Sequence, residues 1–185
     1  TEKNMTEEAL SEYTKAIEVK PGYSEAYYNS GELYASEGRH DKSITAWKKT
    51  LELNPKNADA CFNLGVAYYN QNKLDKAISM WNKLVEMNPN DYDALTSLAD
   101  VYDMQSLTDK AIHTWEKIVE FYPNDAEIQY KLGNAYAKKN MHTTAIPFWE
   151  RAIEIDPSLV NAYYNLGLTY QKMGKQDEAI DVYKK

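Results

Sequence analysis

The side chains that could perform catalysis or hold a metal ion are few and scattered. The chain has one cysteine, Cys61, and three histidines, which are His40, His113 and His142. No two histidines lie one helical turn apart, the spacing that places two ligands on one zinc ion, and one cysteine cannot form a cysteine cluster. Cys61 is therefore expected to pack as a small apolar residue. We predict a protein that is not an enzyme and that holds no metal ion and no cofactor.

Carboxylates and aromatic rings are the abundant functional groups. The sequence holds 16 tyrosines and 4 tryptophans beside 3 phenylalanines, and its net charge is −7. Carboxylates attract cationic side chains, and aromatic rings supply contact area at a low entropy cost, so both suit a surface that recognises a protein. The same acidity argues against nucleic acid, because phosphates are bound by clustered Lys and Arg. We expect a protein or peptide partner with basic side chains, and no nucleic acid.

A period of 34 residues positions the rings. Three columns of residues repeat at this spacing: Pro21, Pro55, Pro89, Pro123 and Pro157; Trp47, Trp81, Trp115 and Trp149; and Tyr34, Tyr68, Tyr102, Tyr136 and Tyr170. Self-similarity at a fixed period of this length is the signature of stacked structural repeats. One tryptophan per period at a fixed place predicts rings that fill the space between helices rather than a ligand site.

Each period is predicted to form two helices. In the copy that spans 160–185, Leu166 and Tyr170 stand four residues apart, which places them on one helical face. Gly174 is predicted to end the first helix, since glycine adopts a left-handed conformation at little cost. Asp177 is predicted to cap the second helix and to favour its dipole. The proline at the end of each period forbids further helix.

This pattern resembles the tetratricopeptide repeat family. When the proline of each period is numbered 32, the family has Leu at position 7, a small residue at 8, Tyr at 11 and an aromatic residue at 24. The copy that begins at Ala58 matches these four positions with Leu64, Gly65, Tyr68 and Trp81. The resemblance implies an all-α fold, a right-handed superhelical solenoid of antiparallel helix pairs.

The period divides the chain into units of one solenoid domain. Residues 1–23 are expected to supply the second helix of a partial repeat, and 160–185 a partial or truncated repeat. The complete copies lie between them: 24–57, 58–91, 92–125 and 126–159. The first copy has Ser30 where the family has Leu, and Ser43 where it has Ala, so looser packing is expected there. Repeat arrays need polar caps, and none is recognisable at either end, so we infer a fragment of a longer protein or ends that pack on another chain, as in a homo-oligomer.

The resemblance also implies where a partner would bind. In the proteins that this chain resembles, positions 2, 5, 9, 12 and 13 line a concave groove that holds peptides, and we name these side chains the groove stripe. The stripe carries seven acidic residues against two basic ones, Lys138 and Lys172. The candidate binding residues are Glu25, Tyr28, Glu32, Asp59, Phe62, Tyr69, Asp93, Asp100, Asp103, Glu127, Tyr130, Asn134 and Tyr164. Such an acidic, aromatic groove is expected to hold a basic or extended segment of a partner protein.

A second pattern concerns position 6 of the first helix. One subtype of the family grips peptide backbones with a ladder of asparagines at this position. Asn29, Asn63 and Asn165 fit the ladder, while Ser97 and Lys131 interrupt it. The sequence therefore predicts a partial ladder only.

Two other functions stay open beside that of a protein-interaction scaffold. The chain could be a structural module that self-assembles through uncapped ends, or a domain that delivers substrates to an enzyme outside this segment. No apolar run of about 18 residues is present, so no membrane insertion is expected. A cytoplasmic location is favoured, and a periplasmic or other extracytoplasmic one stays open if a leader was removed.

Overall fold

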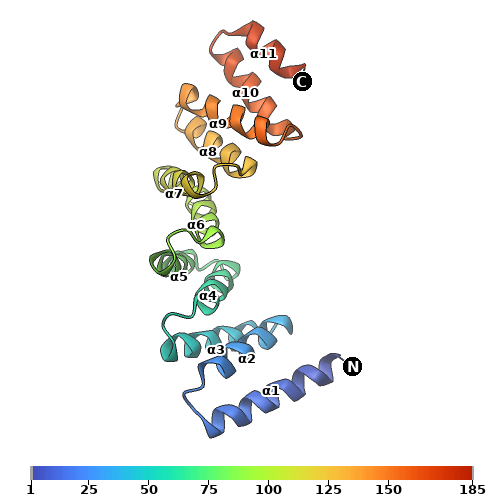
Figure 1. The fold of residues 1–185 in the computed structure, drawn as a ribbon, viewed down its shortest axis with the longest axis vertical. Coiled ribbons are helices and arrows are strands. Elements are labelled where there is room, and N and C mark those ends of the chain that lie inside the picture. Colours follow the sequence, from blue (N-terminus) through green and yellow to red (C-terminus); the bar gives the residue numbers. More distant parts are fainter. Residues whose placement is uncertain (1, 185) are drawn as a thin grey trace. The chain divides into compact units, whose positions relative to one another are not determined.

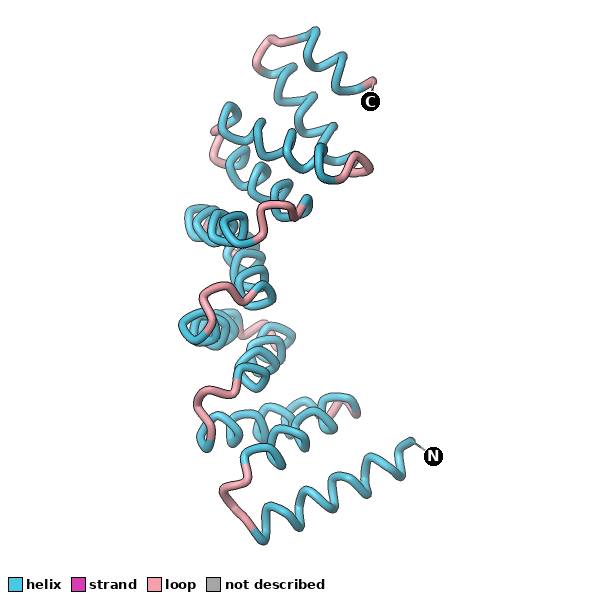
Figure 2. The backbone as a smooth tube through the Cα atoms, in the orientation of Figure 1, coloured by secondary structure: helices cyan, strands magenta, loops and turns pink. Residues whose placement is uncertain are grey.

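Helices alone build the described part of the chain. The structure, a computed structural model, describes residues 2–184, with side chains described from Met5 onward. These residues form eleven helices (Figure 1) and no strand (Figure 2). The helices are α1 (Glu2–Val19), α2 (Ser24–Ser36), α3 (His40–Leu53), α4 (Ala58–Asn70), α5 (Leu74–Met87), α6 (Tyr92–Met104), α7 (Thr108–Phe121), α8 (Ala126–Lys138), α9 (His142–Ile155), α10 (Val160–Lys172) and α11 (Gln176–Tyr183). The predicted all-α fold is confirmed.

Two compact units, residues 1–94 and residues 95–185, divide the chain. In the first unit each of α1 to α4 packs on the helix that follows it, and α7 to α10 do the same in the second. Short turns join α2 to α3, α4 to α5 and α8 to α9, so the helices of each pair run antiparallel (Figure 1). This stacking of helix pairs is a helical solenoid. The grouping of all copies into one domain stays a prediction.

The turn inside each helix pair has the same backbone in every copy. One residue of each turn has a positive φ angle: Gly38, Asn72, Ser106, Asn140 and Gly174. The next residue donates its N–H to the carbonyl of the tyrosine at position 11, at 2.9 Å both from Lys73 to Tyr68 and from Lys175 to Tyr170. This bond closes the helix end as a Schellman motif does. Gly174 ends its helix as predicted, and asparagine or serine takes the same role in other copies.

The prediction that Asp177 caps a helix is wrong. In the part of the chain that the structure describes, α3, α5, α7, α9 and α11 begin without a hydrogen bond from a capping side chain. Asp177 lies in the first turn of α11, where its charge favours the dipole as expected. Some of the first helices hold caps instead: Asn57 Oδ1 accepts from Ala60 N at 2.7 Å, and Asp125 Oδ1 accepts from Ile128 N at 3.1 Å, whereas α2 and α10 have none. Each such cap follows its proline by two residues, so one short segment ends a helix and starts the next.

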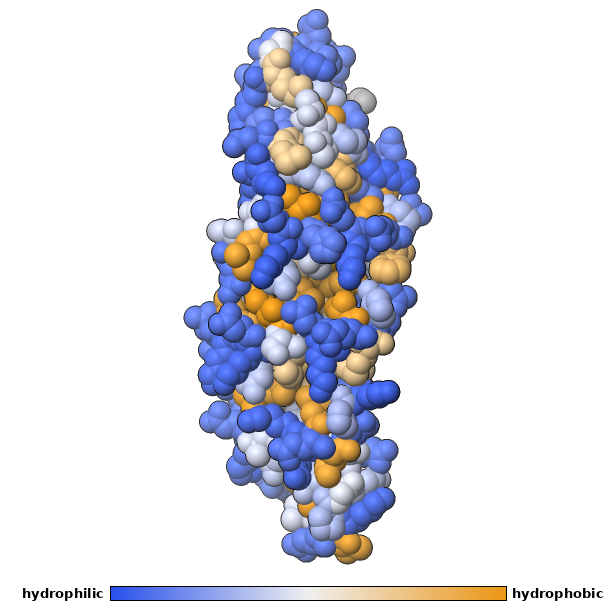
Figure 3. Space-filling model, turned by 90° about the vertical axis from the view of Figure 1, so that its left-hand side faces the viewer, coloured by the Kyte–Doolittle hydropathy of each residue, from blue (hydrophilic) through white to orange (hydrophobic). Residues whose placement is uncertain are grey.

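The tryptophan column lies in the interior, as predicted. Trp81 is 2% exposed and Trp149 is 1% exposed. The glycine at position 8 allows this approach, because a Cβ built on Gly133 would lie only 2.6 Å from Trp149 Nε1. On the face drawn in Figure 3, hydrophobic residues reach the surface in patches that hydrophilic side chains separate. The tryptophan rings therefore stabilise the fold, and the rings of the groove stripe are left for recognition.

Candidate peptide-binding site

The groove stripe of the first unit lies on α2, on α4 and at the start of α6. On α2, Ala26 and Gly31 are buried, whereas Glu25 and Glu32 are exposed. The predicted site residues of this unit are all exposed or half-buried: Glu25, Tyr28, Glu32, Asp59, Phe62, Tyr69 and Asp93. No stripe position of this unit carries a basic side chain. This part of the stripe is therefore both accessible and acidic.

Tyr28, Glu32 and Asn63 form a hydrogen-bonded cluster in the first unit. Asn63 Nδ2 donates to Glu32 Oε1 at 2.7 Å and to Tyr28 Oη at 3.5 Å. Burial raises the pKa of the Tyr28 hydroxyl, and the charges of Glu32 and Asp59 raise this pKa further. Both carboxylates thus act on the phenol as negative charges, which disfavour its ionised form. A cation at the same place would be stabilised by the same two charges.

Tyr69 connects the groove stripe to the core. Its ring centroid lies 6.2 Å from that of Trp81, with an angle of 44° between the ring planes. Tyr69 is 37% exposed, whereas Trp81 is 2% exposed. The contact with the fixed indole restricts the phenol before any partner arrives. Little further side-chain entropy is therefore lost when a partner packs against Tyr69.

Lysines neutralise two of the stripe carboxylates in the second unit. Lys131 Nζ lies 2.9 Å from Asp100 Oδ1, and Lys138 Nζ lies 2.6 Å from Asp103 Oδ1. The Lys131 amine also lies 5.0 Å from the ring centroid of Trp115, in a cation–π contact. The stripe of this unit is consequently less acidic than its composition indicates. The ion pair of Lys131 was not predicted, because Lys131 stands at position 6, outside the stripe.

Position 6 of one copy pairs with position 9 of the copy before it. Three such pairs are found, each separated by 31 residues in sequence: Asn63 with Glu32, Lys131 with Asp100, and Asn165 with Asn134. The asparagine ladder expected at position 6 is thus engaged within the protein at Asn63 and Asn165. The 31-residue offset is the sequence signal that identifies these pairs.

Asn134 is the centre of a hydrogen-bond network in the second unit. Its Oδ1 accepts from Trp149 Nε1 at 3.0 Å and from Asn165 Nδ2 at 2.8 Å. Asn165 Nδ2 also donates to Tyr130 Oη at 3.4 Å, so Asn134 and Tyr130 are brought together. A cavity of about 390 Å³ adjoins the network and is also lined by Lys172. The remaining predicted site residues of this unit are exposed: Glu127 and Tyr164.

Replacing Asn134 with leucine is expected to lower the free energy of unfolding by about 1–2 kcal/mol, because two donors lose their acceptor. These donors are Trp149 Nε1 and Asn165 Nδ2. Urea denaturation followed by far-UV circular dichroism measures the change. The control is Val66→Leu, at the same position of an earlier copy, where no acceptor is lost and the change should stay within about 0.5 kcal/mol. Equal losses in both variants would contradict the assigned role of Asn134.

Neither a metal site nor a reactive thiol is found in the described structure. No group of three or more His, Cys, Asp or Glu side chains within residues 5–184 is placed to hold a metal ion. Cys61 is 0% exposed, and burial raises the pKa of its thiol, so the nucleophilic thiolate is disfavoured. The predicted packing role of Cys61 is confirmed. None of the described helices combines the length and apolarity that a membrane span requires.

Family models match most of the chain. A model described as TPR repeat matches residues 31–72 and 133–174. Two models described as Tetratricopeptide repeat match residues 58–91 in one case, and 12–45 and 80–113 in the other. No curated protein matches the chain significantly.

Several solved structures share the fold. YrrB, described as a TPR protein with an unusual peptide-binding site, is 25% identical over 92% of this chain and 88% of its own, with a TM-score of 0.78. A MamA protein is 28% identical over 87% of this chain and 88% of its own, with a TM-score of 0.77. MamA from Desulfovibrio magneticus RS-1 is 19% identical over 87% of this chain and 91% of its own, with a TM-score of 0.74. The last of these shows similarity of fold alone.

Proposed function

Because the chain belongs to the tetratricopeptide repeat family, we propose that it is a protein-interaction scaffold whose groove stripe binds a basic, extended segment of a partner protein. The repeat is generally a non-catalytic interaction module, and YrrB, which shares the fold, is a TPR protein with a peptide-binding site. One observation carries the preference for basic partners. It is the cluster of Tyr28, Glu32 and Asn63, with Asp59 acting on the same phenol.

The cluster suits one cationic side chain. Asn63 holds the Glu32 carboxylate through the 2.7 Å bond, so this oxygen is fixed before a partner arrives. A lysine or arginine that enters beside Glu32 gains a charge-assisted hydrogen bond and can also lie against the ring of Tyr28. Glu32 and Asp59 are both exposed, so added salt should weaken the attraction.

An extended segment fits the spacing of the stripe rings. Tyr28 and Phe62 stand at position 5 of successive copies, on α2 and α4. The bond from Asn63 to Glu32 joins α2 to α4, so the stripe continues from one copy to the next. Alternate residues of an extended segment point to one face, so apolar and basic residues on that face can meet the stripe rings and the stripe carboxylates.

The second unit is expected to contribute contacts to a bound segment but not to select cations. Asp100 and Asp103 already face Lys131 and Lys138, so a partner lysine would have to displace an equal charge. Such an exchange yields little net electrostatic gain at an exposed site. The exposed ring of Tyr164 stays available for apolar contact.

The double variant Glu32→Gln/Asp59→Asn is expected to weaken binding of a Lys- and Arg-rich peptide by about tenfold or more, because both carboxylates of the cluster are removed. Isothermal titration calorimetry measures the affinity. The wild-type affinity should fall as salt is raised, and the salt dependence should be smaller in the double variant.

Asp103→Asn serves as the matched control, since this stripe carboxylate is already neutralised by Lys138. It should change the affinity by less than about twofold. The same peptide with glutamate at its basic positions should not bind. The proposal is overturned if acidic and basic peptides bind equally well, or if the double variant binds as tightly as the wild type. Light scattering on the free protein tests the alternative of self-assembly.

A further inference from the structure

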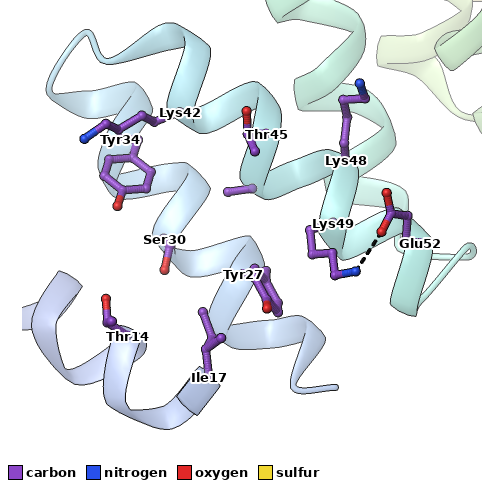
Figure 4. Close-up of a pocket in the computed structure, with 11 residues that line it drawn as sticks. Thr14, Ile17, Tyr27, Ser30, Tyr34, Lys42, Thr45, Lys48, Lys49 and Glu52 are labelled. Carbon is purple, nitrogen blue, oxygen red and sulfur yellow. Dashed lines mark hydrogen bonds and ion pairs between the residues drawn. The ribbon is translucent and has the colours of Figure 1, made fainter. Parts of the chain in front are cut away.

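A cavity of about 580 Å³ lies among α1, α2 and α3 of the first unit (Figure 4). Tyr27, Ser30 and Tyr34 line it from α2, and Ile17 lines it from α1. In Figure 4 the side chains of Ser30 and Tyr34 project from α2 toward α1. These α2 residues follow one another at steps of three and four, on a face that carries no member of the groove stripe. The cavity is therefore separate from the stripe.

Ser30 widens this cavity on the side of α2. It stands at position 7, where the other copies have leucines that are at most 3% exposed: Leu64, Leu98, Leu132 and Leu166. The Ser30 hydroxyl donates to the carbonyl oxygen of Ala26 at 2.7 Å, so its own polar group is satisfied within the helix. The looser packing expected at Ser30 is thus found, and the volume lies in the range of ligand sites.

The cavity is basic although the whole chain is acidic. Lys42, Lys48 and Lys49 line it from α3 against a single carboxylate, that of Glu52. Lys49 Nζ lies 2.8 Å from Glu52 Oε2, and a dashed line marks this ion pair in Figure 4. Lys42 Nζ lies 5.5 Å from the ring centroid of Tyr34. In Figure 4 the side chain of Lys48 points away from Tyr27 and Ser30. Lys42 forms no ion pair with a described carboxylate, so its charge at this cavity is left for an anionic partner.

We propose that this cavity is a second interaction site, which binds an acidic segment of a partner protein and takes one bulky apolar side chain of that segment beside Ser30. The cavity supplies both halves of this recognition. The rings of Tyr27 and Tyr34 and the side chain of Ile17 contact the apolar group. Lys42, whose amine lies beside the ring of Tyr34, attracts an acidic residue next to the apolar group.

The apolar part of the cavity selects a segment over a small anion. A free carboxylate or phosphate could meet Lys42 but would leave Ile17 and the rings of Tyr27 and Tyr34 uncovered.

Two faces of α2 would thus select partners of opposite charge. The stripe face presents Glu32, and the cavity face adjoins Lys42 of α3. The cavity site does not depend on the groove proposal, because the two sites share no residue. A single unit of this scaffold could hold a basic segment and an acidic segment at the same time.

The test is calorimetric titration of the full chain with an unstructured peptide in which glutamates flank one tryptophan. Ser30→Leu should weaken binding by about tenfold or more, because leucine takes the space beside Ser30 that the apolar side chain would occupy. Lys42→Gln should weaken binding by about fivefold or more. The same peptide with lysine in place of glutamate, or with alanine in place of tryptophan, should bind at least about tenfold more weakly than the parent peptide.

Lys76→Gln is the matched control. Lys76 stands at the position of Lys42 in the next copy, with its Nζ 5.6 Å from the ring centroid of Tyr68, but there Leu64 occupies the recess. This variant and Glu32→Gln should bind the acidic peptide as the wild type does. Because Glu32 does not line the cavity, a failure of the groove proposal can be told apart from a failure of this one. Absence of binding to the wild type, or unchanged binding by Lys42→Gln, would overturn the inference. The lysine variant decides the matter if Ser30→Leu does not fold.

Discussion

Replacing Trp81 with alanine is expected to lower the free energy of unfolding by about 3–5 kcal/mol. The indole is 2% exposed and contacts the ring of Tyr69, and it packs where any Cβ on Gly65 would collide with it. Its removal leaves a hole that close-packed helices cannot close by small shifts. A buried ring of about 150–250 Å² contributes roughly 4–6 kcal/mol as an upper bound, which agrees with the expected loss. Urea denaturation followed by far-UV circular dichroism measures it.

Tyr164→Ala is the control for this variant. Tyr164 is 57% exposed and belongs to the groove stripe, so its removal should cost less than about 1 kcal/mol. The contrast separates rings that build the fold from rings that are free to meet a partner. If both variants lost the same stability, the division between core rings and groove rings would be wrong.

Replacing Gly133 with valine is expected to lower the free energy of unfolding by about 3 kcal/mol, because the added side chain overpacks a filled interior. The first added carbon alone would lie 2.6 Å from Nε1 and 2.7 Å from Cδ1 of Trp149. Trp149 is 1% exposed, and its Nε1 is held by Asn134 at 3.0 Å, so the ring can move only if that bond breaks. The same denaturation experiment measures the loss.

Gly133→Ala is the comparison that shows how much of this effect is steric. Alanine favours a helix by about 1 kcal/mol over glycine, which offsets part of the collision. The third copy already has alanine here, as Ala99 is 0% exposed and Trp115 beside it is 2% exposed. The alanine variant should therefore lose clearly less stability than the valine variant. A valine variant as stable as the wild type would mean that position 8 does not need glycine.

The helical fold could be predicted because independent local signals agree with one another. Apolar positions at steps of three and four mark helices, and the proline of each period marks where they end. The turn inside each pair gives a second kind of end signal: α4 ends at Asn70, just before the positive φ of Asn72. Glycine was the expected end signal, yet Asn72 takes the same conformation, since a short polar side chain tolerates it. The division into repeat units stays a prediction.

Contacts between copies could not be predicted from the pattern inside one copy. Asp100 and Asp103 were counted as available charges, but whether a lysine reaches them depends on the separation of neighbouring helices. That separation is set by the packing of the side chains between the helices, which the period does not describe. In the same way, the departure at Ser30 was visible in the sequence, whereas the lysines that surround the resulting cavity come from α3.

The bond from Asn63 to Glu32 joins α2 to α4 across the seam between two copies. A cation that binds Glu32 competes with Asn63 for the same carboxylate. Binding at Glu32 and the contact between these two copies are therefore coupled, so a ligand held in one copy also acts on how that copy meets its neighbour.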